Sequence, residues 1–212
     1  IDAVCLTHEH DDHKASLHVL HRRYGVSVYS NSGTIEALRG NPKLSALPWN
    51  VFTTGQPFQI GDLVLEPFRV PHDSYDPVGF VVRCGDARIG VATDMGMATE
   101  LIRQRLRNCE ALVLESNHDE AMLQASTRPW SLKQRIAGRQ GHLSNSKAGS
   151  LIVDVAGETL QTVFLAHLSR DCNTPALATT TVERVLQREG LSHIAVKMTH
   201  ASGVSDVVTV PS

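Results

Sequence analysis

The chain has 212 residues, of which 42% are hydrophobic, and its formal net charge is −2 at pH 7. This length and apolar content suit one compact domain, expected to span residues 1–212, and no linker, low-complexity tract or fixed repeat divides the sequence. The small charge excludes a global attraction to nucleic acid, so any such attraction must be local.

Apolar periodicity predicts alternating strands and helices in the first half of the chain. Residues 1–6 predict a strand, 14–24 a helix, 26–29 a strand and 33–38 a helix. Residues 51–70 predict short strands broken by Gly55 and by Gly61-Asp62, and residues 78–83 and 88–92 predict a hairpin.

The second half of the chain alternates in the same way. Helices are expected at about 98–108, 119–126, 131–138, 144–156 and 174–189, and strands at 111–114, 162–166 and 193–196. Ser144 is a predicted N-cap, and Pro175 suits the first turn of the last helix. These elements predict a mixed α/β fold.

The first expected strand is followed at once by Thr7-His8-Glu9-His10-Asp11-Asp12-His13. This turn holds three imidazoles, those of His8, His10 and His13, together with the carboxylate of Asp12. Imidazole nitrogens and carboxylate oxygens are the ligands that Zn²⁺ and Mn²⁺ take in proteins. The pattern therefore predicts a site for two adjacent divalent ions, which suits hydrolysis.

The order His-x-His-x-Asp-His after a strand resembles the metallo-β-lactamase family, whose fold is a four-layer αββα sandwich with a dinuclear site at one edge. Three later motifs resemble the remaining ligand positions of that family: Val70-Pro71-His72-Asp73, Ala92-Thr93-Asp94-Met95-Gly96 and Leu165-Ala166-His167-Leu168-Ser169. His72, Asp94 and His167 each follow an apolar run, so we expect each at the carboxyl end of a strand.

The resemblance implies a division of these ligands between two ions. Carried over by position, one ion is held by His8, His10 and His72, and the other by Asp12, His13 and His167, while Asp94 bridges the two. Zn²⁺ suits the number of imidazoles, and Mn²⁺ suits the positions that bear carboxylates.

Two further motifs resemble phosphodiesterase members of the family such as tRNase Z. Glu115 ends an apolar run in Leu114-Glu115-Ser116-Asn117-His118, and His142 lies in Gly141-His142-Leu143-Ser144-Asn145. In those enzymes such a pair stands beside the metals and protonates the leaving oxygen, so the resemblance implies that Glu115 orients His142. The alternative is that Glu115 caps a helix and His142 merely precedes one.

The longer string of motifs resembles the WalJ (YycJ) branch of small bacterial metallo-hydrolases over nearly all 212 residues. That resemblance implies a nuclease, with DNA exonuclease activity favoured and RNA as the other nucleic acid substrate. The interval between Asp94 and His167 is too short for the extra β-CASP domain of RNase J-like nucleases.

Charge placement also indicates a polyanionic substrate. Between Glu120 and Asp154 the sequence has no acidic residue, and this interval holds Arg128, Trp130, Lys133, Arg135, Arg139 and Lys147. We expect Arg135 and Arg139 to share a helix face and to bind successive phosphates, while Trp130 stacks on a base. The alternative is a solvated cationic helix with Trp130 in the core.

The implied reaction is hydrolysis of a phosphodiester by a hydroxide that two divalent ions activate. Asp12 is expected to orient or deprotonate that nucleophile, and His142, supported by Glu115, to protonate the departing oxygen. Three alternatives stay open: a tRNase Z-like endoribonuclease, a hydrolase of small lactones or thioesters, and a non-catalytic module that binds metal and a protein partner.

One departure from the family is that its first strands normally precede the histidine motif, whereas this sequence begins six residues before Thr7. We expect a fragment in which one sheet lacks its first strands and exposes an edge. The sequence has no run of 18 apolar residues, no signal peptide and no C-x-x-C among its four cysteines, so we expect a cytoplasmic protein with no membrane partner. Because many members of the family are dimers, the resemblance implies a possible homodimer.

Overall fold

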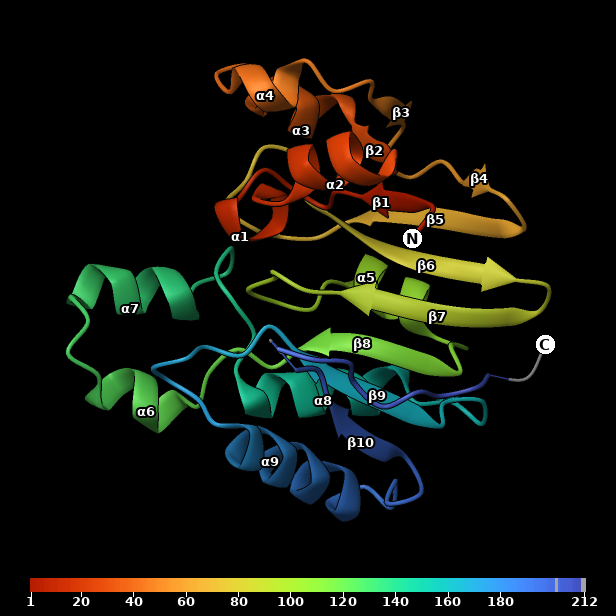
Figure 1. Ribbon diagram of the computed structural model, residues 1–212. Coiled ribbons are helices and arrows are strands. Elements are labelled where there is room, and N and C mark those ends of the chain that lie inside the picture. Colours follow the sequence, from red (N-terminus) through yellow and green to blue (C-terminus); the bar gives the residue numbers. More distant parts are fainter. Residues whose placement is uncertain (201, 211–212) are drawn as a thin grey trace.

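Two β-sheets lie face to face, and helices cover the outer face of each, so the chain forms the predicted four-layer αββα sandwich (Figure 1). The structure is a computed structural model and describes residues 1–200 and 202–210. No helix in these ranges is both long enough and apolar enough to cross a membrane.

The small sheet is parallel, in the order β1-β2-β3, with strands Ala3–Cys5, Ser27–Asn31 and Asn50–Phe52. The helices of this half are α1 (Asp11–Lys14), α2 (Leu17–Tyr24), α3 (Ser32–Ala37) and α4 (Pro42–Ser45). Leu17 of α2 and Leu44 of α4 pack with Val28 of β2 in one buried cluster. Burial of these apolar side chains holds the outer helices on this sheet.

The large sheet has the order β10-β9-β8-β7-β6-β5-β4. Its strands are β4 (Phe58–Ile60), β5 (Leu63–Arg69), β6 (Val78–Cys84), β7 (Ala87–Ala92), β8 (Ala111–Glu115), β9 (Thr162–Ala166) and β10 (Ala195–Met198). Strands β7 to β10 are parallel, and β4 to β7 are antiparallel neighbours. Consequently β5, β7, β8 and β9 all run in one direction, and their carboxyl ends share one edge.

The outer face of the large sheet is covered by α5 (Glu100–Leu106), α8 (Asn145–Val155) and α9 (Pro175–Arg188). Ile102, Ile152 and Val182, one from each helix, join the largest buried cluster together with residues of the strands. Two further helices, α6 (Glu120–Ala125) and α7 (Trp130–Ala137), lie at the end of the sandwich toward which β7 and β8 point (Figure 1).

An aromatic cluster fills the space between the sheets. Phe52 of β3 stacks on Phe58 of β4 with ring centroids 4.8 Å apart, and it meets Phe80 of β6 edge to face at 5.6 Å. Offset and edge-to-face contacts are the favourable geometries for aromatic rings. This cluster fixes the small sheet, and with it the loop that follows β1, against the large one.

Most expected elements are confirmed, and three differ. The helix expected at 14–24 is interrupted at residues 15–16, because Lys14 ends α1 and α2 begins only at Leu17. The short helix α4, capped by Asn41 and with Pro42 at its first turn, was not predicted. Strand β10 begins at Ala195 instead of residue 193, because the backbone N–H of Ile194 donates to Leu191 in a turn.

Candidate metal centre

The carboxyl ends of four strands carry polar side chains at one edge of the large sheet. His72 follows β5, Asp94 follows β7, Glu115 ends β8 and His167 follows β9. The loop after β1 reaches the same edge with His8 and His10, and helix α1, which follows that loop, adds Asp12 and His13. All seven side chains that the sequence predicts as ligands therefore lie together, although β1 belongs to the other sheet.

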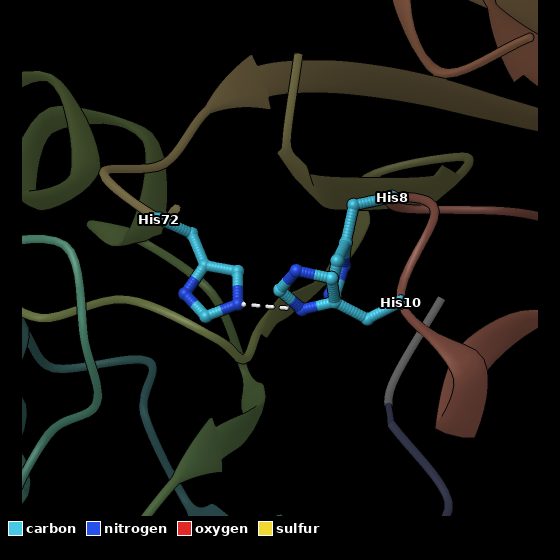
Figure 2. Close-up of side chains that lie close together, drawn as sticks. All are labelled: His8, His10 and His72. Carbon is cyan, nitrogen blue, oxygen red and sulfur yellow. Dashed lines mark hydrogen bonds between the residues drawn. The ribbon is translucent and has the colours of Figure 1, made fainter. Parts of the chain in front are cut away.

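His8, His10 and His72 form a first group, in which one ligand nitrogen of each lies within 4.8 Å of the others. Figure 2 shows His8 and His10 coming from the loop after β1, with His72 facing them from the opposite side. His72 Nε2 lies 3.2 Å from His10 Nδ1, and the rings of His8 and His72 meet edge to face at 5.0 Å. Three imidazoles that converge in this way suit one divalent ion.

Asp12, His13 and His167 form a second group by the same measure. Asp12 Oδ2 lies 3.3 Å from His167 Nε2 and 3.7 Å from His13 Nε2. The hydrogen bond with His167 holds the pKa of Asp12 well below its usual range, although the Asp12 side chain is 63% exposed. The second group thus places an ionised, solvent-facing carboxylate beside two imidazoles.

Asp94 lies between the two groups. Its Oδ2 is 3.2 Å from His13 Nε2, and its Oδ1 is 3.4 Å from His167 Nε2 and 3.8 Å from His72 Nε2. Asp94 thus lies within 4 Å of histidines from both groups, which is compatible with the bridging position that the family resemblance implies.

Three of the histidines, His8, His13 and His72, have a protein partner at Nδ1, and the Nε2 atoms of His13 and His72 lie against other side chains of the cluster. His72 Nδ1 donates to the carbonyl oxygen of Gly141 at 3.2 Å. The Thr7 hydroxyl lies 3.0 Å from Nδ1 of His8 and 3.2 Å from Nδ1 of His13. Such partners fix the tautomer of a metal-binding histidine and direct its other nitrogen, here Nε2, toward the ion.

Among the described residues, the buried His8 Nε2 has no hydrogen-bond partner, and the buried Asp94 Oδ2 makes no hydrogen bond of normal geometry although His13 Nε2 lies 3.2 Å away. Burial, helped by the nearby His13, lowers the pKa of His8 to about 3, so its imidazole is neutral. Burial alone raises the pKa of Asp94, but His13 and His167 hold it well below the usual range. A neutral imidazole and an ionised carboxylate are the forms that bind metal, so these residues fit a divalent ion.

Glu115 is fully buried, and both of its oxygens are engaged within the protein. Oε2 accepts from the backbone N–H groups of Met95 (3.0 Å) and Leu143 (3.1 Å), and Oε1 accepts from Nδ1 of His142 (2.6 Å) and of His167 (2.9 Å). Burial alone raises the pKa of Glu115, but the hydrogen bonds from the two imidazoles lower it. The ionised carboxylate thus orients His142, as predicted, and also His167, which was not predicted. The alternative that Glu115 caps a helix is wrong.

Asp94 and His167 have left-handed backbone conformations, with φ of 58° and 57°. For residues other than glycine such conformations cost about 1–3 kcal/mol and concentrate at functional sites. Asn117 stabilises the second turn, because its Nδ2 donates to the His167 carbonyl at 3.0 Å and its own carbonyl accepts from Ser169 N at 2.8 Å. The strained turns aim both side chains into the cluster.

A buried amide network supports these turns, and the sequence analysis missed it. Asn173 Nδ2 donates to the carbonyls of Ser116 (2.9 Å) and Asn117 (3.1 Å), and Ser116 Oγ donates to Asn145 Oδ1 (2.7 Å). Asn145 Nδ2 donates to Asn173 Oδ1 at 3.0 Å. The one signal in the sequence was an asparagine beside each motif, as in residues 116–118, 144–145 and 171–173.

The predicted basic residues lie near the cluster, but several already have protein partners. Arg128 pairs with Asp171 at 2.8 Å, Arg135 pairs with Asp73, and Lys133 Nζ donates to the Gln124 carbonyl. Trp130 is 62% exposed, so the alternative that it packs in the core is wrong.

The prediction that Arg135 and Arg139 share a helix face is also wrong. Helix α7 ends at Ala137, because Gly138 is extended, and Arg139 lies beyond it with Nε 3.4 Å from Met97 Sδ. These two cations, which were expected on one helix face, are instead divided between α7 and the turn that precedes His142.

Comparison with known proteins agrees with this architecture. The family model described as "Beta-lactamase superfamily domain" matches residues 1–168. The chain is 34% identical to Exodeoxyribonuclease YycJ of Bacillus anthracis over 196 residues, which is 90% of this chain and 72% of that protein. It is 31% identical to Exodeoxyribonuclease WalJ of Streptococcus pneumoniae serotype 2 over 194 residues, with the same two shares. The metallo-beta-lactamase fold protein YhfI from Bacillus subtilis superposes with a TM-score of 0.70 at 17% identity, covering 94% of this chain and 74% of that one.

Replacing Asp94 by Ala should reduce the metal content from about two ions per chain to one or fewer, because both groups lose the shared carboxylate. Metal analysis of the purified variant checks this. Asp86→Ala is the control, since Asp86 is exposed in the turn between β6 and β7 and should leave the content unchanged. A full metal complement in Asp94→Ala would contradict the bridging position.

Gly96→Ala should destabilise the fold by about 1–3 kcal/mol or more, the cost of overpacking. An added Cβ would lie 2.1 Å from the Gly138 carbonyl oxygen and 2.4 Å from the Arg139 carbonyl carbon, and backbone atoms cannot move aside cheaply. Urea unfolding measures the effect. Gly40→Ala is the control, because nothing lies within 4 Å of its added Cβ. Equal stability of the two variants would show that the close approach at Gly96 does not matter.

Proposed function

Because the chain belongs to the β-lactamase superfamily, and within it to the family of YycJ and WalJ, we propose that it is a metal-dependent hydrolase that removes nucleotides from an end of DNA. The observation that supports a phosphodiesterase best is the Glu115–His142 hydrogen bond beside the two ligand groups. A hydrolase of small lactones or thioesters has less support, because neither the relatives nor the exposed cations at the cluster indicate one.

The two groups described above would hold one divalent ion each, with Asp94 shared between them. When bound, such ions supply a water molecule of lowered pKa and neutralise charge on the phosphate. We assign zinc first, because five of the seven ligand side chains are imidazoles, and manganese as the alternative.

Asp12 is placed to act on the attacking water. Its carboxylate is ionised and 63% exposed, and it lies at the solvent side of the second ligand group. An ionised carboxylate can accept a hydrogen bond from water and so orient it toward the phosphorus atom. Asp12 therefore both completes the ligand group and positions the nucleophile.

His142 is placed to protonate the leaving oxygen. Its Nδ1 donates to Glu115 Oε1 at 2.6 Å, so Nε2 is the atom that is left to carry the transferred proton. The buried carboxylate of Glu115 fixes the orientation of the His142 ring, as the carboxylate of a catalytic triad does for its histidine. After transfer, the His142–Glu115 hydrogen bond persists.

The polyanionic substrate would meet cations from three segments near the cluster. Arg128 precedes α7, Arg135 and Lys133 lie on it, and Arg139 follows it, while the exposed ring of Trp130 offers a surface on which a base can stack. DNA is favoured over RNA because both relatives reported above are named exodeoxyribonucleases. A homodimer and a cytoplasmic location stay predictions from the sequence.

Incubation of the metal-loaded protein with end-labelled duplex DNA, single-stranded DNA and RNA tests the proposal. We expect release of mononucleotides from DNA, and none when His8 is replaced by Ala. Internal cuts in RNA with intact DNA would indicate an endoribonuclease instead, and hydrolysis of lactones alone would exclude a nuclease.

His142→Ala should lower the rate of DNA hydrolysis by about 10²–10⁴-fold, the usual contribution of a general acid, while the metal content stays unchanged. Rate and metal content are measured on the same preparation, with His193→Ala as the control because His193 is exposed outside the cluster. Loss of bound metal in His142→Ala would mean that this histidine is a ligand.

A further inference from the structure

Next to His142 the protein has an open cavity of about 430 Å³, within the range of pockets that bind small organic ligands. His142 and His167 are among the residues that line it. Because His142 is the proposed proton donor, whatever occupies this cavity lies on the side of the leaving oxygen. A bound substrate would therefore place in this cavity the part that carries the leaving oxygen.

Three guanidinium groups line the cavity, but they differ in their partners. Arg128 and Arg135 are neutralised by Asp171 and Asp73 respectively. Arg170 is exposed and makes no ion pair or side-chain hydrogen bond within residues 1–200 and 202–210. Arg170 is therefore the cation of this cavity that is available to an anionic ligand without the loss of an existing pair.

Part of the cavity lining is apolar. Leu132 and Ile136 of α7 and Leu168, which follows His167, are half-buried and face the same space. Apolar walls with a few charged groups are typical of sites for organic anions, because the walls contact the flat or aliphatic part and the cations bind the charge. A nucleotide, with a base, a sugar and a phosphate, has this composition, whereas a free inorganic anion does not need the apolar wall.

We infer that this cavity receives the nucleotide that carries the leaving oxygen, with the phosphate of that nucleotide on Arg170 and its base or sugar against Leu132, Ile136 and Leu168. The inference rests on the proposed nuclease function and names the part of the substrate that the cavity selects. In the sequence, Arg170 lies outside the interval between Glu120 and Asp154 that holds the other cations. It reaches the cavity because the loop after β9 brings it there, so the sequence alone did not indicate its role.

Binding of deoxyadenosine monophosphate tests the inference, because this molecule has both a phosphate and a free 3′ hydroxyl. Calorimetry on the metal-loaded protein compares its Kd with that of deoxyadenosine, which lacks the phosphate. We expect the monophosphate to bind at least about tenfold more tightly, since hydrogen bonds between charged groups are stronger than those between neutral ones. Arg170→Glu should remove this preference, and Arg170→Lys should restore part of it.

Arg188→Glu is the matched control, because Arg188 is an exposed residue at the end of α9 and the charge change is the same. The control should bind the monophosphate as the unmodified protein does. An unchanged preference in Arg170→Glu would place the phosphate elsewhere, for example on the metal ions, and would overturn the inference. Equal weakening in both arginine variants would also overturn it, since the effect would then be one of net charge.

The outcomes for the cavity and for the nuclease are distinguishable. If DNA is hydrolysed but the preference for the monophosphate does not depend on Arg170, the cavity assignment fails and the nuclease proposal stands. If no DNA is hydrolysed and the preference still depends on Arg170, the cavity is a nucleotide site and the nuclease proposal fails.

Discussion

The buried carboxylate of Glu115 joins parts of the chain that are distant in sequence into one site. Its Oε2 fixes the backbone after β7 and the backbone before α8, and its Oε1 fixes the imidazoles of His142 and His167. A charge with no exposed surface is tolerated only when its hydrogen-bonding capacity is filled, and here four donors fill it. The Glu115 carboxylate therefore fixes the position of His167, a predicted metal ligand, relative to His142, the proposed proton donor.

The topology makes this arrangement possible. Since β5, β7, β8 and β9 point the same way, the connections that follow these four strands leave the large sheet at one edge. The aromatic contact between Phe52 and Phe58 then holds the small sheet so that the loop after β1 meets this edge. Close backbone packing at Gly96 and the amide network around Asn173 keep the connecting turns in place. Rigid elements thus support a site whose predicted ligands come from four segments of the chain, namely residues 8–13, His72, Asp94 and His167.

Local sequence features predicted those parts of the fold and the site that depend on a single segment of the chain. The apolar runs before His72, Asp94 and His167 were enough to place each at a strand end, because strand periodicity is a local property. The grouping of these residues into two metal sites came from a family resemblance, and the geometry is compatible with it. Gly138 was a readable signal that α7 stops before Arg139, and it was overlooked.

Contacts between distant segments could not be read from the sequence. Arg135 hydrogen-bonds to Asp73, which is 62 residues away in the sequence, and Asn173 to Ser116, which is 57 residues away. Arg170 lines the cavity because the loop after β9 carries it there. No periodicity or spacing encodes such pairs, because they form only when the sheet brings the loops together. For this reason the sequence identified the ligands better than it identified the surface around them.

We propose that two ions bind at this edge of the sheet, with Glu115 and His142 outside their ligand spheres. Anomalous X-ray diffraction from crystals of the metal-loaded protein, recorded at the absorption edge of the bound metal, tests it directly. The account predicts two peaks, one among His8, His10 and His72 and one among Asp12, His13 and His167, both beside Asp94. A single peak, or a peak coordinated by Glu115 and His142, which also lie within ligand distance of Asp94 and His167, would contradict it.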